Sequence, residues 1–157
     1  GLIGAFALFA YGYERATRDI DITLAGSDRE TIASFLLSLG FESIHDGDAF
    51  SSFLHPLESL RVDVMYLDEK TSREVFAHTS EHLLMDDLTV PVVSPGHLVA
   101  MKLFSIREDP GRTLKDLADV QQLYERGAVP EETIRELCTK YDLKEYIPQI
   151  IGTGRDA

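Results

Sequence analysis

The stretch Arg15-Ala16-Thr17-Arg18-Asp19-Ile20-Asp21-Ile22-Thr23-Leu24 places an Asp-x-Asp pair inside a run rich in β-branched residues. Side chains two residues apart on a strand point to the same face, so Asp19 and Asp21 project together. The other face carries the apolar side chains of Ile20, Ile22 and Leu24. Two carboxylates side by side repel each other unless water solvates them or a hard divalent cation lies between them. The stretch therefore predicts either a magnesium site or an exposed edge strand with two solvated acids.

A second strand-like run, Arg61-Val62-Asp63-Val64-Met65, also has an acid at its centre. Aspartate is depleted in strands, so its presence in an apolar strand is unusual. If this strand lies beside the first, three carboxylates converge. Three such acids can hold two Mg²⁺ ions about 3.5–4 Å apart and promote an in-line phosphoryl or nucleotidyl displacement. The alternative is that Asp63 pairs with Arg61 or faces solvent.

Length and charge narrow the class of protein. The chain has 157 residues, enough for one domain or a domain with a small appendage. Its net charge of −12 makes DNA an unlikely partner, because phosphate backbones are bound through an excess of Lys and Arg. One cysteine, Cys138, excludes an intrachain disulfide and favours a cytoplasmic location. No apolar run of about 18 residues is present, so no membrane span is expected.

Hydrophobic periodicity predicts an α/β fold, with a small mixed β-sheet, flanking helices and a C-terminal helical segment. Residues 1–93 form the predicted core, and residues 94–157 form the helical segment that packs on it to give one compact unit. The opening Gly-Leu-Ile-Gly reads as the end of a strand entering a turn, which suggests that a further element precedes it. Strands are expected over 2–3, 17–24, 41–44, 50–55, 60–67 and 89–93. Helices are expected over 5–11, 31–39, 71–77, 95–106, 112–126, 131–139 and 143–151.

The run from Gly4 to Asp21 combines a glycine turn, a short apolar segment and Asp-x-Asp on a strand. It resembles the opening motif of the nucleotidyltransferase superfamily related to polymerase β, and is most similar to the small bacterial branch that includes AbiEii-like toxins. Asp63 matches the third carboxylate of that superfamily. Further similarity lies in Val92-Val93-Ser94-Pro95, Leu98, Met101-Lys102 and Lys115-Asp116-Leu117-Ala118-Asp119. The resemblance spans roughly residues 3 to 125, and the combination of motifs is more specific than any one of them.

The resemblance implies a metal-dependent nucleotidyltransferase that moves a nucleoside monophosphate from an NTP to an acceptor hydroxyl. It also implies Mg²⁺ or Mn²⁺ as cofactor and a link to toxin–antitoxin systems. The implied metal ligands are Asp19, Asp21 and Asp63, which form the catalytic set together with Lys102. The implied nucleotide-binding residues are Gly4, Ala5, Arg15, Arg18, Lys102 and Asp116. The acceptor stays open among a protein, a small molecule and tRNA, and the base preference and oligomeric state stay open as well.

Ala5 departs from the family pattern, which has Gly or Ser at this turn position. Backbone N–H groups of such a turn can cradle a triphosphate. Alanine still offers its N–H, but it removes a hydroxyl and limits φ. A second hypothesis therefore stays open, namely a non-catalytic nucleotide-binding or regulatory module with the same fold.

Lys102 is the one charged residue in the apolar run 98–106. Its side chain either snorkels to water or contacts an anion such as phosphate. In the second case, Lys102→Met weakens nucleotide binding and leaves the fold intact. Arg112, Asp116 and Asp119 fall at positions i, i+4 and i+7, so they form one stripe of a predicted helix. The spacing of Arg112 and Asp116 favours an ordinary surface ion pair. In the related branch this acidic stripe approaches the active site.

Overall fold

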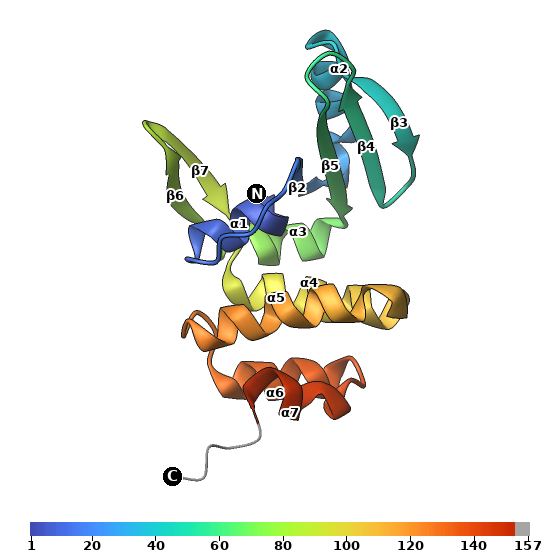
Figure 1. Cartoon of the computed structure of the whole chain (residues 1–157). Coiled ribbons are helices and arrows are strands. Elements are labelled where there is room, and N and C mark those ends of the chain that lie inside the picture. Colours follow the sequence, from blue (N-terminus) through green and yellow to red (C-terminus); the bar gives the residue numbers. More distant parts are fainter. Residues whose placement is uncertain (153–157) are drawn as a thin grey trace. The chain divides into compact units, whose positions relative to one another are not determined.

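The computed structural model describes residues 1–152, which form two compact units (Figure 1). The first unit holds Gly1–Ala10 and Glu14–Val93. The second holds Tyr11–Tyr13 and the described residues from Ser94 onward. Residues 153–157, the end of the predicted helical segment, lie outside the described residues. Each unit is described by itself below.

The first unit is built on a mixed sheet with strand order β3-β4-β5-β2-β1-β7-β6. Its central strand, β2, runs parallel to β5 and antiparallel to β1. Strand β1 is parallel to β7, whereas the pairs β3–β4, β4–β5 and β6–β7 are antiparallel. The strands are β1 (Leu2–Ile3), β2 (Asp19–Ala25), β3 (Glu42–Asp46), β4 (Phe50–His55), β5 (Leu60–Leu67), β6 (Ser80–Met85) and β7 (Leu88–Val92). The predicted α/β class with a mixed sheet is confirmed.

One face of the β2–β5 region is apolar and holds the sheet together. Its buried cluster consists of Leu36, Phe41, Phe53, Val62, Val64 and Tyr66, with Ile20, Ile22 and Leu24 packed against it. Full burial of such a side chain contributes about 1.5–3 kcal/mol, so this cluster fixes which face of each strand points inward. The helices of this unit are α1 (Gly4–Ala10), α2 (Arg29–Ser38) and α3 (Glu69–Phe76), with a 3₁₀ turn, η1 (Gly26–Asp28). Because strand side chains alternate, the polar residues of β2 and β5 share the opposite face.

The second unit is helical. Its elements are α4 (Pro95–Glu108), η2 (Pro110–Arg112), α5 (Thr113–Glu125), α6 (Glu131–Lys140), η3 (Lys144–Tyr146) and α7 (Ile147–Ile151). Helix α4 begins as predicted, with Ser94 as the N-cap and Pro95 in the first turn. Cys138 of α6 is fully buried, and burial raises the pKa of its thiol to about 11. The thiol therefore behaves as a small apolar side chain, as is usual for a buried cysteine.

Two segments differ from the sequence prediction. Residues 80–85 form strand β6, which makes a hairpin with β7. In this part of the chain the sequence predicted one strand, over 89–93, and none over 80–85. Strand β6 is mostly exposed, so it lacks the buried alternation by which a strand is recognised. The predicted helix 143–151 consists of the 3₁₀ turn η3 followed by the short helix α7.

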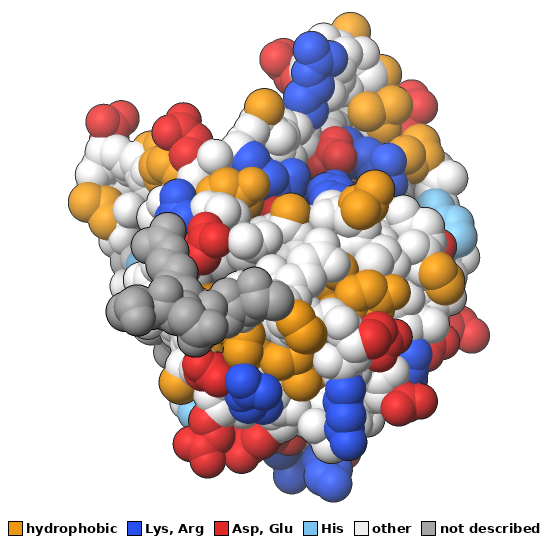
Figure 2. Space-filling model, turned by 60° about the horizontal axis from the view of Figure 1, so that its bottom comes forward, with side chains coloured by type: hydrophobic (Ala, Val, Ile, Leu, Met, Phe, Trp, Pro, Cys, Tyr) orange, Lys and Arg blue, Asp and Glu red, His pale blue; other side chains and the backbone are white. Residues whose placement is uncertain are grey.

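The surface carries both signs of charge. Acidic and basic side chains are interspersed on the face drawn in Figure 2. The net charge of −12 is thus not gathered into one area of that face. Within residues 1–152, no helix has both the length and the apolar character that a membrane crossing requires.

Candidate active site

Strands β2 and β5 bring the three predicted metal ligands to one face of the sheet. The strands are parallel neighbours, with Asp21 opposite Asp63 and Asp19 opposite Arg61. Register partners point to the same side, and Asp19 lies one pleat from Asp21 on that side. The condition for convergence of the three acids, that their strands are adjacent, is therefore met.

The glycine turn lies directly against this acid face. Gly4 has a φ of +65°, and a β-carbon added to it would overlap the carboxylate of Asp21. Only glycine suits this position, because it tolerates positive φ and has no side chain to collide with the acid. The next residue, Ala5, is buried. The turn that resembles a phosphate-binding loop is thus in contact with Asp21, the second acid of the Asp-x-Asp pair.

Asp63 already has partners. Its Oδ1 accepts a hydrogen bond from Arg61 Nε at 2.8 Å and another from Ser52 Oγ at 2.7 Å. Arg61 Nη2 also donates to Ser52 Oγ at 3.2 Å, which closes a small network on neighbouring strands. The Arg61 pairing that the sequence left open as an alternative is therefore present, and it coexists with placement of Asp63 on the acid face.

Arg61 brings a positive charge to this face. Its hydrogen bond to Asp63 and the negative charges of Asp63, Asp19 and Asp21 raise the pKa of its guanidinium, although burial acts in the opposite direction. The Arg61 side chain is 40% exposed, whereas that of Asp63 is 15% exposed. The guanidinium therefore supplies positive charge to three acids from a position that still reaches water.

The donor set fits a hard divalent cation. Carboxylate oxygens are the ligands that Mg²⁺ and Mn²⁺ prefer, and three of them share one face of adjacent strands. Among residues 1–152, no three His, Cys, Asp or Glu side chains lie close enough together to enclose a metal ion as they stand. On this face, Asp63 Oδ1 accepts hydrogen bonds from Arg61 and Ser52. The predicted metal site therefore remains a prediction.

The two predicted arginine contacts lie in the segment that leads into β2. Arg15 is half-buried and Arg18 is exposed. Between the two arginines, the Thr17 hydroxyl accepts a hydrogen bond from the Asp19 N–H at 3.2 Å and so fixes the strand entry. Their role in nucleotide binding stays a prediction.

Lys102 and Asp116 lie in the second unit, where they form a buried ion-pair network. Lys102 Nζ is 3.1 Å from Asp116 Oδ1 and 2.5 Å from Asp119 Oδ2. Arg112 Nε donates to the other oxygen of Asp116 at 3.0 Å. The lysine side chain is 12% exposed and the two carboxylates at most 2%. Lys102 therefore contacts anions, as one alternative held, but these anions belong to the chain itself.

The prediction of an ordinary surface pair between Arg112 and Asp116 is wrong, because Asp116 is buried. The spacing is right, but the Asp116 side chain is 1% exposed. Burial acts to raise the pKa of the Asp116 carboxyl, yet the charge of Lys102 and hydrogen bonds from Arg112 and Lys102 outweigh it, so the pKa is lowered. Asp116 is thus held ionised inside the helical unit, which a surface pair would not require.

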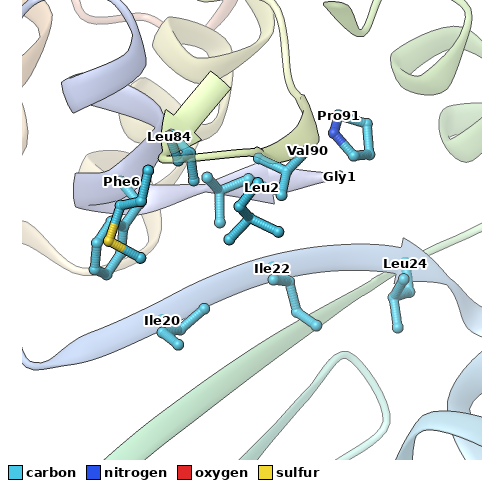
Figure 3. A pocket seen from close by; sticks show the side chains of 11 residues that line it. Gly1, Leu2, Phe6, Ile20, Ile22, Leu24, Leu84, Val90 and Pro91 are labelled. Carbon is cyan, nitrogen blue, oxygen red and sulfur yellow. The ribbon is translucent and has the colours of Figure 1, made fainter. Parts of the chain in front are cut away.

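An apolar groove of about 360 Å³ lies elsewhere in the first unit. In Figure 3, Ile20, Ile22 and Leu24 lie in a row along β2 and line the groove on one side. The other side is formed by Leu2, Phe6, Leu84, Val90 and Pro91. Because these β2 residues alternate with Asp19 and Asp21, the groove opens on the other face from the acids. Its apolar lining does not suit a triphosphate.

Sequence reasoning missed Ser52 and did not anticipate that Asp119 pairs with Lys102, whereas it left the pairing of Arg61 with Asp63 open as an alternative. Ser52 is the register partner of Asp63 in β4. The signal lies in the pairing of β4 with β5, because a serine directly opposite an acid can donate to it. Apart from its place in the acidic stripe, nothing in the sequence indicated that Asp119 is buried.

A mixed sheet with three aspartates on adjacent central strands and a glycine turn against one of them agrees with the resemblance to nucleotidyltransferases. Comparison with known families confirms this class of enzyme. The chain belongs to the AbiEii family, since the family model described as "Nucleotidyl transferase AbiEii toxin, Type IV TA system" matches residues 2–153. No curated protein matches the chain.

Two solved structures resemble the chain. The solution structure of the antibiotic-resistance factor ANT(2'')-Ia aligns with a TM-score of 0.57 and 16% sequence identity, over 96% of this chain and 78% of that one. Lincomycin-bound LnuA, a lincosamide antibiotic adenylyltransferase, aligns with a TM-score of 0.48 and 16% identity, over 62% of this chain and 71% of that one. The first likeness supports the fold, and neither likeness assigns a substrate.

Proposed function

We propose that the chain is a metal-dependent nucleotidyltransferase that transfers a nucleoside monophosphate from an NTP to an acceptor hydroxyl and acts as a toxin of its family. One observation carries the proposal. Asp21 and Asp63 are register partners on parallel strands, and Asp19 shares their face. Adjacent carboxylates at this density repel one another, so a cation is needed when all three are charged.

The roles proposed for the acids follow from their strands. Asp19 and Asp21, one pleat apart on β2, would hold Mg²⁺ or Mn²⁺ together with the triphosphate, and Asp63 on β5 would complete the ligand set. The bound metal would supply positive charge to the phosphoryl oxygens. Asp63 would also accept the proton of the acceptor hydroxyl, since it alone comes from the neighbouring strand.

The nucleotide contacts in the proposal are the backbone N–H groups of Gly4 and Ala5, with Arg15 and Arg18 before β2. Contact between Gly4 and the Asp21 carboxylate supports a phosphate position beside the acids. The predicted roles of Lys102 in neutralising developing charge and of Asp116 in nucleotide binding stay predictions, because the two side chains pair with each other within the helical unit. The acceptor is a protein, a small molecule or tRNA, and the proposed location is the cytoplasm.

Calorimetry of nucleotide binding, with and without Mg²⁺ or Mn²⁺, tests the first half of this proposal. Binding is expected to tighten by at least tenfold with the metal, because the triphosphate and the acids are both anionic. The double variant Asp19→Asn/Asp21→Asn should lose this metal dependence. Binding that ignores the metal in the wild type, or that is unchanged in the double variant, would contradict the proposal.

Asp63→Asn tests the second half. It should keep part of the nucleotide binding, because Asp19 and Asp21 remain, and abolish transfer, because the ligand and proton acceptor from β5 is lost. Transfer is measured as labelled-nucleotide incorporation or pyrophosphate release in cell extract. A variant that transfers at the wild-type rate would remove Asp63 from the reaction.

A nucleotide-binding or regulatory module without turnover is the second candidate. Two observations favour it, namely Ala5 at the turn and the occupation of Asp63 Oδ1 by Arg61 and Ser52. Metal-dependent binding without pyrophosphate release over protein, small-molecule and tRNA acceptors would favour this module over the enzyme.

A further inference from the structure

Arg61 lies among the three acids. It is the register partner of Asp19 and lies two residues before Asp63, so its side chain projects on the acid face. Its guanidinium donates to Asp63 Oδ1 at 2.8 Å, and the charges of Asp19 and Asp21 also act on it. The chain thus brings its own cation to the face where the proposed function needs a metal.

We propose that Arg61 is a built-in counter-ion that competes with divalent metal for the three acids in the nucleotide-free protein. Metal binding at Asp63 then requires the guanidinium to move away from this carboxylate. This inference rests on the proposed function, because it assumes that the acids bind metal.

The exposure of the two partners supports such an exchange. The Arg61 side chain is 40% exposed, whereas that of Asp63 is 15% exposed on a strand paired on both sides. The arginine can therefore swing to water while the carboxylate stays on the strand. Ser52 Oγ, which hydrogen-bonds both groups, can keep its bond to Asp63 when Arg61 leaves.

The charge balance then links metal entry to nucleotide binding. The guanidinium offsets one of the three negative charges that the carboxylates bring to the face. A metal ion that enters alone meets a positive group a few ångströms away, and this repulsion weakens its binding. A triphosphate that arrives with the metal brings negative charge and offers the displaced guanidinium a new partner, since arginine binds phosphate well.

Mn²⁺ titration of the nucleotide-free protein tests the inference, with calorimetry or the electron paramagnetic resonance signal of free Mn²⁺ as the readout. Arg61→Gln should bind Mn²⁺ at least tenfold more tightly than the wild type, because a positive charge is removed. Arg61→Lys should stay close to the wild type, because it keeps the charge. Ser52→Ala is the matched control, since it removes a hydrogen bond of Asp63 and leaves the guanidinium, and should not tighten Mn²⁺ binding.

Unchanged or weaker Mn²⁺ binding by Arg61→Gln would overturn the inference and assign Arg61 to the orientation of Asp63. If Arg61→Gln does not fold, Arg61→Met serves in its place, and a thermal scan checks each variant. If the proposed function itself is wrong, nucleotide binding by the wild type should not depend on Mn²⁺, which is a different result. Metal-dependent nucleotide binding together with an unchanged Mn²⁺ affinity in Arg61→Gln rejects the inference alone.

Discussion

The carboxylate of Asp21 on β2 lies against the α-carbon of Gly4, in the space that a β-carbon would need. The contact joins the first turn of the chain to the strand that carries two of the three acids. Gly4 also has a φ of +65°, where residues with a side chain are strained. Its conformation and its contact therefore both exclude other residues, and the two effects can be measured separately.

Gly4→Ala is expected to lower the free energy of unfolding by about 2–4 kcal/mol, as the sum of the left-handed backbone and the forced displacement of Asp21. Denaturant unfolding measures the change. Gly127→Ala is the control, because Gly127 has a φ of +70° and nothing within 4 Å of an added β-carbon. It should lose only about 1–2 kcal/mol. Equal losses at the two positions would show that the Asp21 side chain can move away from the added methyl group without a loss of stability.

The double variant Gly4→Ala/Asp21→Ala isolates the contact. Removal of the Asp21 carboxylate should recover the part of the Gly4→Ala loss that comes from overlap, which gives a coupling energy of at least about 1 kcal/mol in a double-mutant cycle. Additive effects of the two substitutions would contradict the contact.

Lys102→Met is expected to destabilise the protein by about 3–5 kcal/mol, because it leaves two buried carboxylates without their shared cation. This expectation replaces the intact fold that the sequence suggested for the same variant. Arg112→Gln is the matched comparison. Its side chain is 52% exposed and Asp116 keeps Lys102, so a smaller loss is expected. Denaturant unfolding of both variants gives the comparison, and equal losses would argue against a special role for Lys102.

Nucleotide titration separates a structural role of Lys102 from a functional one. The variant Lys102→Met/Asp116→Asn/Asp119→Asn removes the cation and both charges together, so its stability should recover most of the loss of Lys102→Met. If Lys102 also contacts the nucleotide, this stable variant should bind nucleotide more weakly than the wild type. Wild-type affinity would restrict Lys102 to holding the helical unit together.

Acid should destabilise the protein through Asp116. The pKa of this carboxyl is lowered in the folded state, so its stabilising effect is present above the ordinary unfolded pKa of about 3.9 and is lost as pH falls through the folded value. The free energy of unfolding should therefore fall as pH drops below about 5. Denaturant curves for Asp116→Asn over the same range should show a shallower fall, and a slope equal to that of the wild type would rule Asp116 out as a source.

Much of the fold could be predicted because its strands alternate clearly. Strands β4 and β5 have the predicted bounds, since apolar residues such as Val62 and Val64 alternate with polar ones along β5. Strand β6 could not be found in this way. It is mostly exposed and is held by pairing with β7, which is a relationship between segments rather than a local pattern.

The candidate site, like the fold, could be predicted where a local pattern exists and not where it depends on contacts between distant segments. Placement of Asp19, Asp21 and Asp63 on one face follows from strand periodicity once the strands are known to be neighbours. The pairing of Asp63 with Ser52, and of Lys102 with Asp119, depends on rotamers and on contacts across 11 and 17 positions of the chain. No local spacing rule reaches that far, so these partners required the structure.

The burial of Cys138 makes the second unit observable by chemistry. The only thiol of the chain is fully enclosed and has a pKa of about 11, so it carries almost no thiolate at neutral pH. An alkylating reagent can modify it only after α6 separates from its neighbours. The rate of modification therefore reports how often the helical unit opens, without an introduced probe, and gives a direct comparison of that opening in the presence and absence of nucleotide.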